Sequence, residues 1–275
     1  MKNEYSIIGK PIAHSLSPIM HNYWFKKYNI KANYTLLEID ENKIEEITQK
    51  VRKGIIKGIN ITLPYKQKII PYLDKIINDA KETKSVNTIY MNDKSELVGE
   101  NTDVYGLQAG YLNKISDSNF LNKKALVIGA GGVAPSAILA LEKSNLREIS
   151  IINRTYDKSL FLKKRFTKLK VYKWNQLEEN IQKSDIVINA TSLGLKNGED
   201  FDIKLNNLKK ELIYIDTIYN PFETNMIKYF KKAGIQKTFN GLEMFIYQGQ
   251  KSFYLWTKIN PEIDNNLINL LKTKL

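Results

Sequence analysis

Cysteine is absent from this chain of 275 residues, and histidine occurs only twice, as His14 and His21. Without cysteine the protein can form no disulfide and offers no thiolate to a metal ion. Two histidines cannot supply a histidine-rich centre either, so we predict no bound metal. The lack of cysteine also agrees with a reducing compartment, and we expect the protein in the cytoplasm.

Long uncharged apolar runs are scarce as well. The first 14 residues contain Glu4 and no apolar run of the length that a signal peptide needs. Residues 125–141 are uncharged and reach the lower limit of a membrane span, roughly 17 residues. Three glycines and a proline interrupt this run. We therefore interpret it as strand, turn and helix, and predict no membrane segment.

Acidic residues are outnumbered, with 29 Asp and Glu against 42 Lys and Arg, which gives a net charge of +13. The lysines are scattered in short groups, and no RRM-like motif, zinc knuckle or helix-turn-helix signature accompanies them. We therefore predict no nucleic-acid partner. A nucleic-acid-binding protein is retained as the third of the alternatives given below. The charge is expected to favour small anionic substrates.

Strands alternate with helices along the front of the chain, which predicts an α/β fold with a largely parallel sheet. Strands are expected at 4–9, 33–39 and 57–63, helices at 18–28 and 41–53, and a hairpin at 87–92 and 96–101. A second series of strands is expected at 124–129, 147–153, 169–173, 185–190, 211–216 and 235–240. A helix is expected at 104–118, and helical structure from Gly241 onward. We predict a first domain at 1–103, completed by helices in 241–275, and a second at 104–240.

The sequence GAGGVAPSAILAL follows a predicted strand and opens a helix, the context that a dinucleotide-binding turn requires. Gly129 would form the tight turn, Gly131 would let the backbone approach a pyrophosphate, and Ala134 would pack the helix on the strand. Pro135 falls in the first turns of the helix, where a missing N–H costs little. Residues assigned to the cofactor here are Gly129, Ala130, Gly131, Gly132 and Val133.

The next predicted strand ends in NRTYDK, where NAD-selective sites usually carry Asp or Glu. Asn153, Arg154 and Thr155 stand there instead, with Lys158 close behind. An arginine at this point pairs with a 2′-phosphate and stacks on adenine. We therefore predict a Rossmann-like domain that binds NADP.

Further polar clusters follow predicted strands or lie in loops. They are HSLSP (14–18), NITLPYK (60–66), SVNT (85–88), GENTDVYG (99–106), NATSLG (189–194), DTIYNP (216–221) and NGLEMFIYQG (240–249). Taken in order with the two motifs above, the set resembles shikimate dehydrogenase over nearly the whole chain.

This resemblance implies a substrate-binding α/β domain, a Rossmann-like NADP domain, and reversible NADPH-dependent reduction of 3-dehydroshikimate to shikimate in the biosynthesis of chorismate and aromatic amino acids. The family's catalytic lysine and aspartate match Lys66 and Asp103. Removing hydride from a secondary alcohol leaves a proton that a base must take. Partial burial adapts a lysine to this task, and a neighbouring carboxylate aims its amine.

The resemblance also implies roles for residues around the substrate and the nicotinamide. Ser15 and Ser17 would bind the substrate carboxylate with Tyr219 nearby, and Thr62, Asn87 and Gln248 would surround the ring hydroxyls. Thr191, Thr217 and Gly241 would lie on the nicotinamide side. Departures from the family pattern, which concern cofactor affinity more than activity, are Val133, Lys158, Leu195 and Glu243.

Three alternatives remain open. A quinate or dual quinate/shikimate dehydrogenase shares the fold and the reaction; the second serine of HSLSP and the NRT turn favour shikimate and NADP. A non-catalytic NADP-binding regulator is expected to lack Lys66 or Asp103, and both are present. A basic nucleic-acid-binding protein would bind with an affinity that falls steeply with salt. The sequence is compatible with a monomer or a homodimer.

Overall fold

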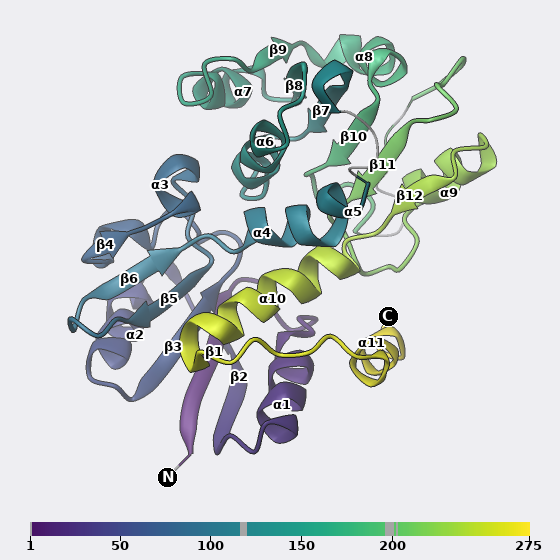
Figure 1. The fold of residues 1–275 in the computed structure, drawn as a ribbon. Coiled ribbons are helices and arrows are strands. Elements are labelled where there is room, and N and C mark those ends of the chain that lie inside the picture. The colour runs from purple at the N-terminus through teal and green to yellow at the C-terminus, as the bar shows by residue number, and fades with distance from the viewer. Residues whose placement is uncertain (1, 116–119, 196–200, 202) are drawn as a thin grey trace. The chain divides into compact units, whose positions relative to one another are not determined.

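The computed structural model describes residues 2–115, 120–195, 201 and 203–275, and within them the chain forms two six-stranded sheets (Figure 1). It divides into two compact units. The first comprises Met1–Gly106 and Ile246–Lys274, and the second Leu107–Phe245 together with Leu275. The α/β class predicted from the sequence is confirmed. In the described part of the chain, no helix is long and apolar enough to cross a membrane.

The sheet of the first unit has the order β2-β1-β3-β5-β6-β4. Its strands are β1 (Asn3–Gly9), β2 (Ala32–Glu38), β3 (Ile56–Ile61), β4 (Lys75–Ile76), β5 (Thr88–Met91) and β6 (Leu97–Glu100). The pairs β1–β2, β1–β3 and β4–β6 are parallel, whereas β3–β5 and β5–β6 are antiparallel. The predicted hairpin is therefore present, and it places β5 beside the strand that leads to Lys66.

Helices cover this sheet because each has an apolar stripe. In α2, for example, Ile44, Ile47 and Val51 recur at helical spacing and are buried against the sheet. The helices of the unit are α1 (Ser17–Lys27), α2 (Ile44–Arg52), α3 (Asp79–Thr83), the C-terminal part of α10 (Leu242–Thr257) and α11 (Asn265–Lys272), with short 3₁₀ turns at Glu41–Lys43 and Ile70–Tyr72.

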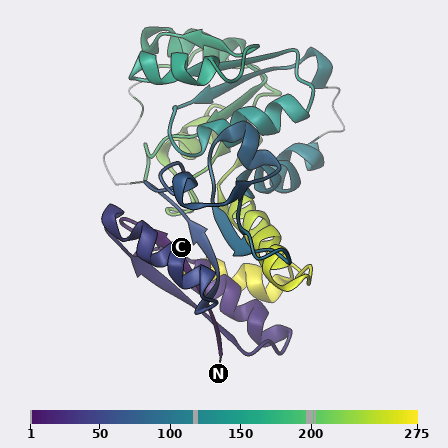
Figure 2. The ribbon, with the colours of Figure 1, turned by 90° about the vertical axis from the view of Figure 1, so that its left-hand side faces the viewer.

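Two glycines let α10 approach its neighbours closely. A Cβ on Gly58 of β3 would lie 2.3 Å from the Trp256 ring, and a Cβ on Gly249 would lie 2.1 Å from Met20 of α1. Glycine at both positions removes these clashes. The end of α10, yellow-green in Figures 1 and 2, thus packs between the sheet and α1.

The prediction of helical structure from Gly241 onward was wrong in one segment. Helix α10 ends at Thr257, Lys258 has a left-handed backbone with φ of 62°, and α11 begins only at Asn265. Pro261 lies between them and cannot donate a helical hydrogen bond. Asp264 then caps α11 by accepting a hydrogen bond from the backbone N–H of Leu267.

The second unit contains a wholly parallel sheet with the order β12-β11-β10-β7-β8-β9. Its strands are β7 (Lys124–Ile128), β8 (Glu148–Ile152), β9 (Lys170–Tyr172), β10 (Ile186–Asn189), β11 (Ile213–Asp216) and β12 (Lys237–Phe239). When the strands are numbered within the unit, this is the 3-2-1-4-5-6 order of a Rossmann fold. The strand order reverses between β7 and β10, which are themselves parallel. Ligands of such sheets bind where the order reverses, at the carboxyl ends of the strands.

The helices of this unit are α6 (Ala134–Lys143), α7 (Tyr156–Lys163), α8 (Leu177–Lys183) and α9 (Asn225–Lys232), with 3₁₀ turns at Phe120–Asn122 and Trp174–Gln176. A helical run begins with α4 (Asp103–Leu107), widens into the π-helical turn η3 (Gln108–Leu112) and ends with α5 (Asn113–Ile115). This agrees with the helix predicted at 104–118, whose last three residues lie outside the described part of the chain.

Candidate active site

Lys66 is a buried lysine, only 7 % exposed, in the turn that follows β3. The turn is held by its own backbone, since the N–H of Tyr65 bonds to the carbonyl of Thr62 and that of Ile69 to the carbonyl of Tyr65. The Tyr65 hydroxyl adds a hydrogen bond of 2.6 Å to the carbonyl of Ile39. The resulting turn directs Lys66 inward, where its Nζ donates to Oδ2 of Asp103 at 2.6 Å.

Asp103 is the first residue of α4 and is fixed from three sides. Its backbone N–H donates to Oδ1 of Asn101 at 3.0 Å. Its Oδ2 accepts from Lys66, and its Oδ1 accepts from Nδ2 of Asn87 at 2.8 Å. A buried ion pair contributes little net stability, because desolvation costs about as much as the attraction returns. The buried pair is therefore a candidate acid–base pair.

The side-chain amide of Asn87 can take only one orientation. Its Oδ1 accepts a hydrogen bond of 2.8 Å from the backbone N–H of Thr102, a group that can only donate. Its Nδ2 must therefore face Oδ1 of Asp103. Gln248, on α10, joins the same cluster, because its Oε1 accepts from the hydroxyl of Thr102 at 3.4 Å. The structure thus brings four of the predicted residues together: Lys66, Asp103, Asn87 and Gln248.

Two further predicted residues, Ser15 and Ser17, form a hydroxyl pair at the start of α1. The Ser15 hydroxyl donates to Oγ of Ser17 at 3.1 Å, and the backbone N–H of Ser17 donates to Oγ of Ser15 at 3.3 Å. Thr62 follows β3, and the chain approaches it so closely at Gly9 that a Cβ there would lie 2.4 Å from the Thr62 methyl. Glycine at position 9 therefore leaves room for the Thr62 side chain.

Tyr219 belongs to the second unit, whereas the other predicted substrate residues belong to the first. Its ring packs against Phe245 with centroids 4.7 Å apart.

The glycine-rich turn of the second unit lies at the reversal point of the sheet. Gly129 has φ of 102°, and a Cβ there would lie 2.6 Å from the methyl of Thr191, which follows β10. Glycine is thus required both by the backbone and by this contact. A Cβ on Gly131 would lie 3.8 Å from its nearest neighbour, the carbonyl of Ala190, so this turn leaves room for a ligand. Helix α6 begins at Ala134, with Pro135 in its first turn as predicted.

Asn153 joins the turns that follow β7 and β8. Its Oδ1 accepts from the backbone N–H of Ala130 at 3.1 Å, and its Nδ2 donates to the carbonyl of Thr155 at 2.8 Å. Arg154, Thr155 and Lys158 are exposed beyond it. An open glycine turn, the N-terminus of a ten-residue helix and an exposed arginine form a donor set that fits a phosphorylated dinucleotide.

Thr191 and Thr217 are both anchored by the buried residue Asn189. Its Oδ1 accepts from the hydroxyl of Thr191 at 2.7 Å, and its backbone carbonyl accepts from the hydroxyl of Thr217 at 2.8 Å. Asn189 is itself oriented by Asp216, whose Oδ1 accepts from Nδ2 at 3.1 Å. At Gly241 a Cβ would lie 2.3 Å from the carbonyl of Thr217, so this glycine allows close backbone packing.

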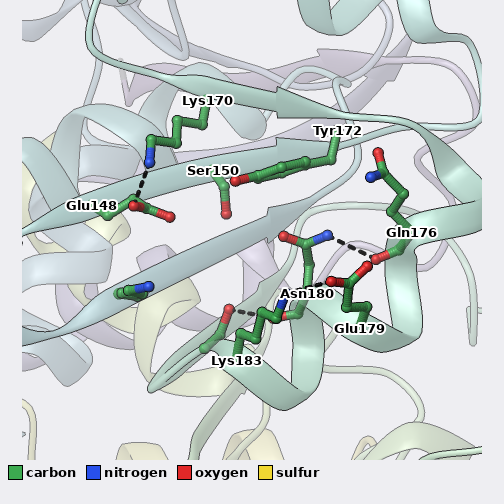
Figure 3. A pocket seen from close by; sticks show the side chains of 10 residues that line it. Glu148, Ser150, Lys170, Tyr172, Gln176, Glu179, Asn180 and Lys183 are labelled. Carbon is green, nitrogen blue, oxygen red and sulfur yellow. Dashed lines mark hydrogen bonds and ion pairs between the residues drawn. The ribbon is translucent and has the colours of Figure 1, made fainter.

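A polar cavity of about 190 Å³ lies elsewhere in the second unit, at the amino ends of β7, β8 and β9 (Figure 3). Lys170 and Glu148 form an ion pair of 2.6 Å in it, and Lys183 pairs with Glu179. The cavity is thus at the opposite end of these strands from the glycine-rich turn, and it is distinct from the predicted cofactor site.

Comparison with protein-family models gives three matches in order along the chain. The Shikimate dehydrogenase substrate binding domain matches residues 7–89, Shikimate / quinate 5-dehydrogenase matches residues 112–221, and the Shikimate 5′-dehydrogenase C-terminal domain matches residues 241–265. Together they include both the Lys66 turn and the glycine-rich turn.

Relatives extend the match over nearly the full length. Shikimate dehydrogenase (NADP(+)) of Pelagibacter ubique is 46 % identical over 272 residues, which cover 98 % of this chain and 99 % of that protein. A solved shikimate 5-dehydrogenase of Thermus thermophilus, in complex with NADP(H) and shikimate, has a TM-score of 0.87 at 28 % identity and covers 99 % and 100 % of the two chains. That of Listeria monocytogenes, in complex with shikimate and NAD, has a TM-score of 0.87 at 29 % identity and covers 100 % and 96 %. The chain belongs to the shikimate dehydrogenase family.

Proposed function

We propose that this protein is an NADP-dependent shikimate dehydrogenase, which interconverts shikimate and 3-dehydroshikimate and works toward shikimate in the biosynthesis of aromatic amino acids. The observation that carries the proposal is the buried pair of Lys66 and Asp103, 2.6 Å apart, in a chain that shares nearly its full length with relatives of that name. The first unit would bind the substrate, and the second unit the cofactor.

In this proposal Lys66 takes the proton of the substrate hydroxyl during oxidation and returns it during reduction. NADP, when bound, would supply the chemistry of hydride transfer. Asp103 holds the Lys66 amine in place through Oδ2 and offers its carboxylate to a substrate hydroxyl. Asn87, Thr62 and Gln248 bind the ring hydroxyls, and the Ser15–Ser17 pair binds the substrate carboxylate, with Tyr219 completing the set. Short hydroxyl and amide groups suit a small polyol acid, which offers hydrogen bonds and little apolar surface.

NADP binding is assigned to the second unit. The pyrophosphate would lie at the N-terminus of α6 against Gly129, Ala130, Gly131, Gly132 and Val133. Asn153, Arg154, Thr155 and Lys158 would bind the 2′-phosphate and the adenine, with Thr191, Thr217 and Gly241 on the nicotinamide side. Arg154 supports NADP over NAD, because a guanidinium pairs with a phosphate through two parallel hydrogen bonds.

The test is the absorbance of reduced nicotinamide when the purified protein is mixed with NADP and shikimate. Parallel reactions contain NAD, quinate, the Lys66→Ala variant and the Lys68→Ala variant. Lys68 is a matched control, since it lies two residues on but is exposed and paired with Glu41. We expect NADP- and shikimate-dependent reduction that falls by about 10²- to 10⁴-fold without Lys66 and is unchanged without Lys68.

The other outcomes separate the alternatives. If quinate is oxidised faster than shikimate, quinate replaces the proposed substrate. If NAD is reduced faster than NADP, NAD replaces the proposed cofactor. In both cases the proposed reaction type is kept. A folded protein that binds NADP but reduces it with neither substrate would contradict the proposal and favour a regulator.

A further inference from the structure

A cluster of buried amide and hydroxyl groups lies behind the proposed catalytic residues in the first unit. Its members are Asn60, Thr88, Thr102 and Ser252, which are 5, 0, 0 and 0 % exposed. None of them was assigned a role from the sequence. Buried polar groups are costly unless they are satisfied, and a fully connected network of them specifies one geometry.

The sheet and α10 bring these side chains together. Asn60 of β3 and Thr88 of β5 are paired residues of an antiparallel ladder, so their side chains lie on the same face. Ser252 of α10 contacts that face: its Oγ lies 2.8 Å from Oγ1 of Thr88 and accepts from Nδ2 of Asn60 at 3.0 Å. Ser252 also lies 3.2 Å from Oγ1 of Thr102. It is therefore the point at which strand β3, strand β5 and the GENTD loop meet.

The direction of the hydrogen bonds is fixed by main-chain groups. Nδ2 of Asn60 donates to the carbonyl of Asn87 at 3.1 Å, and a carbonyl can only accept. Oδ1 of Asn60 must then face away from this carbonyl, and it accepts from the buried hydroxyl of Tyr34 at 2.7 Å. Asn60 thus holds the backbone of Asn87, the residue whose amide contacts Asp103.

The hydroxyl groups of Ser252 and Thr102 extend the hydrogen-bond network to the side chain of Asn87. Ser252 donates to the carbonyl of Gln248 at 3.0 Å, which leaves its lone pairs for Asn60 and Thr88. Oγ1 of Thr102 accepts from Nδ2 of Asn87 at 2.9 Å. The second hydrogen of the same amide group reaches Asp103 at 2.8 Å.

The other end of the network lies at Tyr34 of β2. Its hydroxyl donates to Oδ1 of Asn60. Continuous polar contacts therefore run from Tyr34 through Asn60 and Asn87 to Asp103 and Lys66, all within one unit.

We infer that Ser252 and Asn60 are positioning residues, which hold Asn87 so that its amide orients the Asp103 carboxylate toward Lys66. The inference rests on the proposed function and adds two buried residues to those assigned to the substrate. Ser252 acts through Thr88 and Thr102, and Asn60 acts through the backbone of Asn87. A small displacement of such a support costs rate more than binding, because the reacting groups must be aligned to within a fraction of an ångström.

The test compares Ser252→Ala with Ser6→Ala. Ser6 is a matched control, because it is a buried serine of the same unit, 2 % exposed, whose hydroxyl pairs with Thr35 outside the network. With NADP and shikimate we expect Ser252→Ala to lower kcat by about ten-fold while KM for shikimate changes by less than about two-fold. Ser6→Ala should change neither constant by more than about two-fold. Thermal unfolding of both variants establishes that they are folded.

A second pair of variants keeps the test decisive if Ser252→Ala does not fold. Thr88→Val removes the hydroxyl and keeps the shape, whereas Thr88→Ser keeps the hydroxyl. We expect the first to lose kcat and the second to retain it. Equal kcat values for the two Thr88 variants, a kcat loss no larger than that of Ser6→Ala, or a change confined to KM would overturn the inference. An inactive wild-type protein in this assay would instead overturn the proposed function, and the inference with it.

Discussion

Nζ of Lys66 and Oδ2 of Asp103 lie 2.6 Å apart, with 9 % and 6 % of their side chains exposed. The pair joins the turn after β3 to the first residue of α4. Water does not screen an ion pair at this depth as it does at the surface, so each member controls the position of the other. In the proposed function, this contact holds the amine ready for a substrate hydroxyl.

Replacing Asp103 with Asn is therefore expected to lower kcat for shikimate oxidation by about 10²- to 10⁴-fold. The amide keeps the size of the side chain but removes the charge that orients Lys66. Steady-state rates over a range of shikimate concentrations measure the effect. Asp40→Asn, which changes an exposed aspartate of the same unit paired with Lys10, is the control. An Asp103→Asn rate within about two-fold of wild type would refute a role for the pair.

Arg154 is expected to set the cofactor preference, because it is the exposed arginine at the carboxyl end of β8. Loss of a charge-assisted hydrogen bond costs about 1.5–3 kcal/mol, so Arg154→Ala should raise KM for NADP by roughly 10- to 100-fold and leave that for NAD nearly unchanged. Arg147→Ala is the matched control, since Arg147 is exposed just before the amino end of the same strand. Parallel rises in KM for both cofactors would argue against a 2′-phosphate contact.

Asp216 is expected to support the nicotinamide side of the cofactor site. Its carboxylate accepts hydrogen bonds from Asn189, the backbone of Ile218, Tyr214 and Thr224, at 2.8–3.1 Å. In Asp216→Asn, the NH₂ group replaces one of the two acceptor oxygens. It therefore faces at least one hydrogen-bond donor, and the hydrogen bond from that donor is lost. Asp216→Asn should therefore lower the free energy of unfolding by about 1–3 kcal/mol and also raise KM for NADP.

The control for this prediction is Asp185→Asn, at the amino end of β10. Asp185 accepts from the backbone of Lys124 at 2.8 Å and pairs with Lys209, far along the strand from the Thr191 loop. The Asp185→Asn variant should be less stable than the wild type, and its KM for NADP should be unchanged. An unchanged KM in Asp216→Asn, measured beside a clear loss of stability, would limit Asp216 to a structural role.

The sequence predicted most of the strands because their signals are local. A buried parallel strand is a short apolar run, and glycine and polar clusters mark its ends. The glycine-rich turn after β7 was predicted for the same reason, since Gly129, Gly131 and Ala134 occur at fixed spacing after such a run. The two-residue strand β4 and the π-turn at Gln108–Leu112 carry no comparable signal, because partners distant in sequence determine them.

The network behind the active site was not predictable in the same way. Asn60 interrupts an apolar strand, which is a signal of a buried polar role, although not of its partners. Ser252 is an ordinary serine in a long helix, and its importance follows only from the packing of α10 over β3 and β5. Sequence motifs therefore indicated the residues expected to meet ligands, and tertiary structure was needed to find those that hold them.

His21 is expected to make the stability of the first unit depend on pH. It is fully buried beside Tyr34, with ring centroids 4.4 Å apart, and burial lowers its pKa from 6.5 to about 3, which a polar contact with Asn60 opposes only in part. Between these two values the unfolded chain binds a proton that the folded chain does not. Stability from this histidine is therefore complete above pH 6.5 and is lost as the pH falls toward 3.

Between pH 7 and pH 5.5 the expected loss is about 1 kcal/mol of unfolding free energy. His21→Phe keeps a buried ring and removes the titrating group, so its stability should fall less than that of the wild type over this interval. His14→Gln, which removes the exposed histidine, should behave like the wild type. Urea titrations at the two pH values measure the differences. Equal pH dependence in His21→Phe and the wild type would mean that other groups cause the acid sensitivity, and that His21 is hydrated or charged in the folded protein.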